Sequence, residues 1–192
     1  MKTLPVLVLP LALFASACGG PAASGGGPTT GGTEPETAST DGAASEPKGA
    51  RPPDFELPTL TGDTVRLSDH LGKDVVLLDF WATFCDPCLT AMPHLDEVYK
   101  KHKDEGFVVL GISIDGPDSI AEVKTTVAKL GVSFPILLDQ ETSVVALYNP
   151  KTSAPYSVLI GRDGSIITKK EGYTTGDSGA VERDVEAALA KK

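Results

Sequence analysis

This sequence has few cysteines and lacks any run of basic residues. It holds three cysteines in 192 residues, too few for a fold held together by several disulfides. Lys and Arg number 17 against 26 Asp and Glu, a formal net charge of −9, and no basic run is present. Because a nucleic-acid partner requires a basic surface, the sequence predicts none.

Residues 1–17 have the pattern of a secretion signal. Lys2 supplies a positive start, Leu4 to Phe14 is apolar, and Ala15-Ser16-Ala17 offers small residues for cleavage. The apolar stretch is about eleven residues and contains two prolines, too short and interrupted to span a bilayer as a stable helix. We therefore expect the chain to be exported.

Cys18 follows the small residues directly. Ala-Ser-Ala-Cys resembles a bacterial lipobox, which implies that Cys18 is lipidated and becomes the mature N-terminus. Ordinary signal cleavage at the same bond is the alternative, and it would leave Cys18 as a free thiol. The odd cysteine count favours lipidation. The expected location is the periplasmic side of the cell envelope, with a lipid anchor in the membrane.

Residues 19–50 lack aromatic residues, Val, Leu and Ile, and contain nine Gly and four Pro. Such a segment cannot bury apolar surface, so we expect residues 18–50 to form a disordered tether. Residues 51–192 are then a single domain, long enough for a sizeable core.

Hydrophobic patterning in this domain predicts an α/β fold, because apolar strands alternate with amphipathic helices. Two hairpins bracket the turns Thr61-Gly62-Asp63 and Arg162-Asp163-Gly164. The other expected elements are strands at 75–81, 107–114 and 134–138 and helices at 86–103, 118–130, 142–148 and 177–191.

Cys85-Asp86-Pro87-Cys88 directly follows the apolar run 75–81. This order predicts a buried strand that leads into a helix whose first turn carries both thiols. Residues three apart share one helix face, so the two cysteines can form a disulfide. The positive end of the helix favours the Cys85 thiolate, and a thiolate beside a partner thiol exchanges disulfides.

Two other interpretations of this cysteine pair compete with redox chemistry. A purely structural disulfide in so small a ring would stabilise little. Half of a zinc site would need two more ligands, and His94 and His102 are not at a usual spacing from the pair. We predict no metal site, and we assign His70, His94 and His102 no role.

The ordered motifs resemble those of TlpA/ResA-type exported thiol–disulfide oxidoreductases of the thioredoxin superfamily. They are Pro53-Asp54-Phe55-Glu56-Leu57-Pro58, Leu67-Ser68-Asp69, Asp79-Phe80-Trp81-Ala82-Thr83-Phe84-Cys85-Asp86-Pro87-Cys88, Gly111-Ile112-Ser113-Ile114-Asp115, Phe134-Pro135-Ile136-Leu137-Leu138-Asp139 and Val158-Leu159-Ile160-Gly161-Arg162-Asp163-Gly164. The resemblance implies a thioredoxin-like fold with an N-terminal β-hairpin extension and a central strand–helix insertion over residues 106–148.

The resemblance also implies a function. It points to a reductase of disulfides in exported proteins, of the cytochrome c or copper-site maturation type, which receives electrons from a membrane thiol donor. The redox-active disulfide Cys85–Cys88 would serve in place of a cofactor. Cys85, nearer the helix start, is the candidate nucleophile, and Cys88, one turn deeper, would resolve the mixed disulfide.

Asp79 lies within the predicted buried strand, where an unpaired charge is costly. Thioredoxin has an acid at the matching position, which implies that Asp79 accepts the proton of Cys88, with a pKa raised by burial. A solvated Asp79 beyond the end of the strand is the alternative. ResA-like proteins carry a Glu three residues after the second cysteine, where this chain has Ala91.

Other residues are expected around the cysteine pair. Pro155, after Ala154, matches the cis-proline loop that pairs with substrate in thioredoxin folds, and Trp81 and Phe84 are expected to pack around the disulfide. Asp86 adds negative charge beside the thiolate, which favours reductase over oxidase chemistry, or it caps the helix. Pro87 suits the first helical turn.

Two functions of other classes are alternatives to the reductase. A peroxide-reducing redoxin normally has Thr three residues before the cysteine, where this chain has Ala82. A copper-binding thiol module without turnover normally has a Cys-x-x-x-Cys pair, and the present spacing is one residue shorter. Three assays distinguish these functions. Insulin reduction supports the reductase, peroxide consumption the redoxin, and stoichiometric copper binding without turnover the copper-binding module.

Overall fold

The computed structural model describes residues 49–191. The expected signal segment 1–17, Cys18 and nearly all of the expected tether lie outside the described residues. Gly49 and Ala50 are the last two residues of the expected tether, but both form backbone hydrogen bonds with Ile166. Within the described part of the chain, no helix is both long and apolar enough to cross a membrane.

A five-stranded sheet organises the domain, with strand order β5-β4-β3-β6-β7. β3 (Val75–Trp81), β4 (Phe107–Ser113) and β5 (Ile136–Leu138) are parallel, and β6 (Tyr156–Ile160) and β7 (Ile166–Glu171) add an antiparallel edge. β3 is central and buried along its whole length. The predicted α/β sheet with an antiparallel edge is therefore confirmed.

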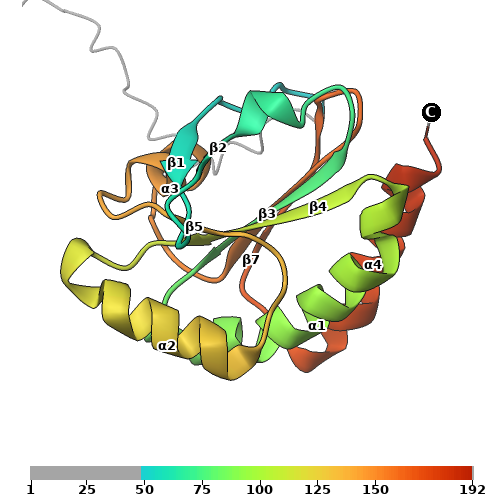
Figure 1. Ribbon diagram of the computed structural model, residues 1–192. Helices are drawn as coiled ribbons and strands as arrows, with labels where there is room; N and C mark the ends of the chain where they lie inside the picture. The colour runs from blue at the N-terminus through green and yellow to red at the C-terminus, as the bar shows by residue number, and fades with distance from the viewer. Residues whose placement is uncertain (1–48, 192) are drawn as a thin grey trace, which may run out of the picture. The chain divides into compact units, whose positions relative to one another are not determined.

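Helices cover one face of this sheet. α1 (Asp86–His102), α2 (Ile120–Leu130) and α4 (Ser178–Leu189) lie together on that face in Figure 1. Leu77 and Trp81 of β3 contribute to the apolar core beneath them, with Val185 of α4. Alternate β3 residues therefore point toward α1, as the period of a strand requires.

The opposite face carries the N-terminal hairpin and α3 (Ser143–Tyr148). The hairpin consists of β1 (Glu56–Pro58) and β2 (Thr64–Arg66), paired antiparallel as predicted. The apolar core on this face of the sheet includes Val76, Leu78 and Phe80, which alternate along β3 with the residues that point toward α1. This confirms the expected hairpin extension.

Short 3₁₀ segments account for most differences from the predicted boundaries. They occupy Leu67–Asp69, Lys103–Glu105, Pro117–Ser119 and Thr175–Asp177. α2 consequently begins at Ile120 rather than at 118. It ends at Leu130 as predicted, where Gly131 takes the left-handed conformation. β5 begins at Ile136, and the Phe134 ring, just before it, packs against Gly111 of β4.

Candidate active site

The two cysteines are joined at the start of α1. Cys85 is the N-cap residue rather than part of the first turn, and its Sγ accepts the Cys88 N–H at 3.3 Å. The Cys85–Cys88 disulfide spans a Cα–Cα distance of 5.3 Å. Cys85 is 7% exposed and Cys88 1% exposed, so Cys85 is the more exposed residue of the pair, as expected.

A carboxylate anchors the loop between β3 and α1. Asp115, just beyond β4, is buried and accepts hydrogen bonds from the Thr83 N–H at 3.1 Å and the Thr83 hydroxyl at 2.6 Å. The Ser113 hydroxyl donates to the same carboxylate at 2.8 Å. Because Thr83 stands two residues before Cys85, this network fixes the approach of the chain to the disulfide. Asp115 had no predicted role, although its position directly after a strand was a usable signal.

The two aromatic residues near the disulfide differ in placement. Trp81 is fully buried and belongs to the apolar cluster that contains both cysteines, in agreement with the prediction. Phe84 does not pack there, because its side chain is 79% exposed. At Phe84 the chain has left β3 and not yet entered α1, so no strand or helix period directs this side chain inward. The expectation for Phe84 was wrong.

Asp86 and Pro87 begin α1 and are exposed. Pro87 lies in the first turn, where its missing N–H costs no helical hydrogen bond. The N-cap position belongs to Cys85, so Asp86 is not the cap. Its side chain adds an acidic group at the helix start.

Asp79 lies within β3 on the face that packs against α1, and it is only 4% exposed. The Oδ2 atom has no hydrogen-bond partner among the described residues. Burial raises the pKa of Asp79 from its ordinary value of 3.8 to about 7, because a low-dielectric environment disfavours the carboxylate. The alternative of a solvated Asp79 is therefore wrong, and the direction of the pKa shift is the one expected from burial.

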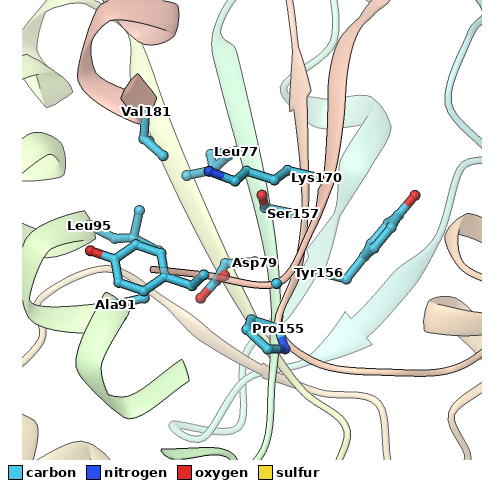
Figure 2. Close-up of a pocket in the computed structure, with 11 residues that line it drawn as sticks. Leu77, Asp79, Ala91, Leu95, Pro155, Tyr156, Ser157, Lys170 and Val181 are labelled. Atoms are coloured by element: carbon cyan, nitrogen blue, oxygen red, sulfur yellow. The ribbon is translucent and has the colours of Figure 1, made fainter. Parts of the chain in front are cut away.

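A small cavity of about 20 Å³ adjoins Asp79, between α1, β6 and β7. Figure 2 shows Asp79 among side chains of this cavity, with Ala91 and Leu95 of α1 on one side and Ser157 of β6 on the other. Ala91 follows Cys88 by one turn, so Asp79 faces α1 one turn beyond Cys88. A volume of this size holds one water molecule.

Pro155 lines the same cavity from the loop that precedes β6. The Ala154–Pro155 peptide bond is cis, as the resemblance implied. β6 begins at the next residue, and its register pairs Tyr156 with Phe80 and Ser157 with Asp79. Ala154 packs against the apolar cluster that includes both cysteines. The expected loop and the cysteine pair therefore meet at the same end of the sheet.

One residue that was given no role is not at the surface. His102, at the end of α1, is buried and faces α4, where its Nε2 lies 3.8 Å from the Glu186 Oε1. His70 and His94 are more exposed and pair with Asp74 and Glu97.

Comparisons with known proteins agree on the class of this domain. The AhpC/TSA family profile matches residues 49–169. A thiol-disulfide oxidoreductase ResA of Bacillus cereus is 34% identical over 127 residues, which cover 66% of this chain and 71% of that protein. ResA of Geobacillus kaustophilus is 34% identical over 139 residues, 72% of this chain and 76% of that protein.

A solved structure shares the fold. The crystal structure of a protein from Chlorobium tepidum, provisionally named thiol:disulfide interchange protein DsbE, has a TM-score of 0.70 and 35% identity. The match covers 76% of this chain and all of that one, 100%.

Proposed function

The chain belongs to the AhpC/TSA family, among its ResA-like thiol–disulfide oxidoreductases of thioredoxin-like fold, and from this premise we propose that it reduces disulfides in exported proteins. The observation that carries the proposal is the Cys85–Cys88 disulfide at the start of α1, together with a buried Asp79 that faces the same helix and whose Oδ2 has no hydrogen-bond partner among the described residues. A reversible disulfide with a proton acceptor beneath it is what two-electron exchange requires.

In the first step the reduced enzyme attacks its substrate. The Cys85 thiolate bonds to one sulfur of the substrate disulfide, the substrate S–S bond breaks, and the second substrate sulfur leaves as a thiolate that takes a proton from water. The greater exposure of Cys85 and its position at the helix N-cap support this role, since the helix dipole stabilises a thiolate there.

In the second step Cys88 resolves the mixed disulfide. Its thiol transfers a proton to Asp79, its sulfur bonds to the Cys85 Sγ, and the first substrate sulfur leaves as a thiolate. Two electrons have then passed from the cysteine pair to the substrate, and the enzyme is left in the disulfide form. A pKa near 7 lets Asp79 accept and release this proton close to neutral pH.

The cis-proline loop is the proposed docking site for the substrate chain. Ala154 and Pro155 lie at the end of the sheet where the cysteines are, and an extended peptide can pair there with exposed backbone groups. The exposed Phe84 ring beside Cys85 adds apolar surface for the same chain. Trp81 belongs to the buried apolar cluster that contains both cysteines.

The proposal also includes the direction of electron transfer and the location of the protein. Asp86 adds negative charge beside Cys85, which destabilises the thiolate and makes the dithiol the stronger reductant. We infer substrates of the apocytochrome c or copper-site type, a membrane dithiol as electron donor, and a lipid anchor at Cys18. An exported, tethered domain suits such substrates, because they fold outside the cytoplasm.

Insulin reduction tests the proposed activity. With dithiothreitol as electron source, the wild-type protein should accelerate the precipitation of insulin chains, and Cys85→Ser should abolish the acceleration. Cys18→Ser serves as the matched control, because it removes a cysteine outside the site and should keep full activity. Peroxide consumption by the wild-type protein without insulin reduction, or stoichiometric copper binding without turnover, would overturn the proposal.

A further inference from the structure

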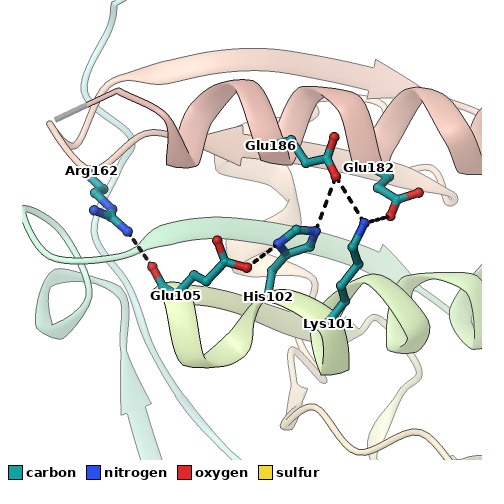
Figure 3. Close-up of polar contacts among 6 residues, drawn as sticks. All are labelled: Lys101, His102, Glu105, Arg162, Glu182 and Glu186. Atoms are coloured by element: carbon teal, nitrogen blue, oxygen red, sulfur yellow. Dashed lines mark hydrogen bonds and ion pairs between the residues drawn. The ribbon is translucent and has the colours of Figure 1, made fainter.

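A polar cluster joins the end of α1 to α4, away from the cysteine pair. Figure 3 shows Lys101 and His102 of α1 directed at Glu182 and Glu186 of α4, with Glu105 on the other side of the His102 ring. His102 follows Cys88 by 14 residues on the same helix, roughly 20 Å along its axis. The cluster is therefore separate from the redox site.

His102 is the feature that requires explanation. Its side chain is 6% exposed, and its Nδ1 lies 2.9 Å from the Glu105 Oε1. The other ring nitrogen, Nε2, has no hydrogen-bond partner among residues 49–191 and points at the Glu186 Oε1 at 3.8 Å. A carboxylate can only accept a hydrogen bond, so Nδ1 carries a proton, and Nε2 is the ring atom that faces the second carboxylate. Nε2 and the Glu186 Oε1 are both atoms that can ligate a metal ion, and they face each other across a gap of 3.8 Å.

The charge balance of the cluster favours the same occupant. Glu105, Glu182 and Glu186 contribute three carboxylates, and the Lys101 ammonium is the cation among them, at 2.6 Å from the Glu182 Oε1 and 3.1 Å from the Glu186 Oε1. The Arg162 guanidinium donates to the backbone oxygen of Glu105 rather than to any of the three carboxylates. The remaining negative charge matches a divalent ion.

We propose that His102, Glu182 and Glu186 form a binding site for a divalent transition metal of the Zn²⁺ class. One ligand atom from each residue lies within 4.8 Å of the others. Zinc bonds of about 2.0–2.2 Å require these atoms to close by roughly an ångström. Glu182 and Glu186 can move that far because their side chains are 37% and 48% exposed, and the exposed Lys101 side chain can swing out as the ion enters.

Two details of the cluster are typical of metal sites. The Glu105–His102 contact is the carboxylate–histidine pair that orients a metal-bound imidazole and raises its basicity. Glu182 and Glu186 are four residues apart on α4, so both carboxylates project to one face. One nitrogen with two carboxylates suits Zn²⁺ better than Mg²⁺ or Ca²⁺, which prefer oxygen ligands alone. Water would complete the coordination.

Titration calorimetry with ZnCl₂ tests the site. The full chain is used in its disulfide form with Cys18 alkylated, so no thiol competes for zinc. We expect one Zn²⁺ per chain and no binding of Mg²⁺. His102→Gln should weaken the affinity for zinc at least about tenfold, and Lys101→Met should strengthen it by removing the competing ammonium. Zinc should also raise the melting temperature, because it binds the folded state and links α1 to α4.

Matched controls separate the site from general charge effects. Asp184→Asn on α4 and Lys100→Met on α1 make the same charge changes outside the cluster and should leave zinc affinity within about twofold. If His102→Gln does not fold, the exposed Glu182→Gln variant makes the same test. Absence of zinc binding by the oxidised protein, equal affinity in these ligand variants, or weaker binding in Lys101→Met would overturn the proposal. None of these results depends on the oxidoreductase activity.

Discussion

Asp79, Asp96 and Asp139 are all buried in this domain, but only Asp79 has a carboxylate oxygen without a hydrogen-bond partner in the described structure. Burial also acts to raise the pKa of Asp96, but the Lys100 ammonium and the Ser133 N–H and hydroxyl outweigh it, so this pKa lies below its ordinary value. The environments of Asp79 and Asp96 therefore shift their pKa values in opposite directions.

Asp79→Asn should stabilise the oxidised protein at alkaline pH. The unfolded carboxyl has an ordinary pKa of 3.8 and the folded one a pKa of about 7. Between these values the folded state binds more protons, so the free energy of unfolding falls as the pH rises from about 4 to about 7. An Asn side chain does not ionise, so the variant should lack this loss of stability, which is on the order of 4 kcal/mol above pH 8. Guanidinium unfolding at pH 5 and pH 8.5 measures the difference.

Asp96→Asn is the control for that experiment. Its folded pKa is lowered, so its carboxylate contributes stability above the unfolded pKa that is lost on acidification. This variant should be destabilised at pH 8.5, the opposite sign. A gain from Asp79→Asn that is equal at both pH values would contradict the assignment of a raised pKa to Asp79.

The burial of Asp79 could be predicted, because it interrupts a run of apolar residues long enough to define a central strand. Phe84 and His102 could not be placed in the same way. Phe84 lies in an irregular turn where no periodicity applies, and the burial of His102 depends on α4, which comes some 80 residues later in the chain. Distant packing of this kind leaves no local signal.

At the scale of elements, α3 depends on a cap from outside the helix. Its N-cap residue Thr142 has a φ of 53° and makes no side-chain cap. Asp139 instead accepts the Val144 N–H at 3.2 Å and the Val145 N–H at 2.8 Å while it is 1% exposed. This carboxylate satisfies the first amides of the helix, as N-cap side chains do.

Asp139→Ala should destabilise the domain by about 2 kcal/mol, because it leaves buried N–H groups without an acceptor. Hydrogen exchange should show lost protection at Val145 before the rest of the domain is affected. The neighbouring surface change Glu141→Ala should alter stability by less than about 0.5 kcal/mol. Unchanged protection at Val145 in Asp139→Ala would show that α3 forms without this cap.

Gly111 allows β4 and β5 to pack under Phe134. A Cβ at this position would lie 2.8 Å from the Phe134 Cε2 and 2.9 Å from the Ile136 Cδ1. Gly111→Ala should therefore cost about 1–3 kcal/mol through overpacking, measured by guanidinium unfolding. Gly116→Ala is the matched control, since the Gly116 φ is −66° and a Cβ added there would meet nothing within 4 Å. Equal stability of the two variants would contradict this account of the packing.

Elements with strong periodicity were predictable within a residue or two, and weakly patterned ones were not. β3 has the predicted bounds because an uninterrupted apolar run defines it, and α1 ends one residue earlier than predicted. β5 has three residues, too few for a period to show. The cis bond before Pro155 followed from the resemblance rather than from local pattern.

At the scale of the molecule, the site is assembled from distant parts of the chain. β3 supplies Asp79, and the start of α1 supplies the two cysteines. The loop before β6 brings Pro155 to this end of the sheet from some 70 residues away in the chain. The strand order β5-β4-β3-β6-β7 makes β3 the neighbour of β6. The order of motifs predicted this arrangement only through the family resemblance.

Lipidation of Cys18 is the prediction that concerns the whole chain. Cells that express the protein with a radiolabelled fatty acid should incorporate label into the wild-type chain and into Cys85→Ser, but not into Cys18→Ser. Label should follow the protein into the membrane fraction. A wild-type protein without label would show that the Ala-Ser-Ala-Cys segment is an ordinary cleavage site.

Mixed-disulfide trapping in the native envelope tests the central claim most directly. Without the resolving cysteine, Cys88→Ser should accumulate covalent adducts with exported proteins, and peptide mapping should place every adduct on Cys85. Cys85→Ser, expressed at the same level, should trap far fewer partners, because its remaining thiol is the less accessible one. Cys88→Ser without adducts on Cys85, or equal trapping by the two variants, would contradict the assignment of Cys85 as the nucleophile of a disulfide reductase.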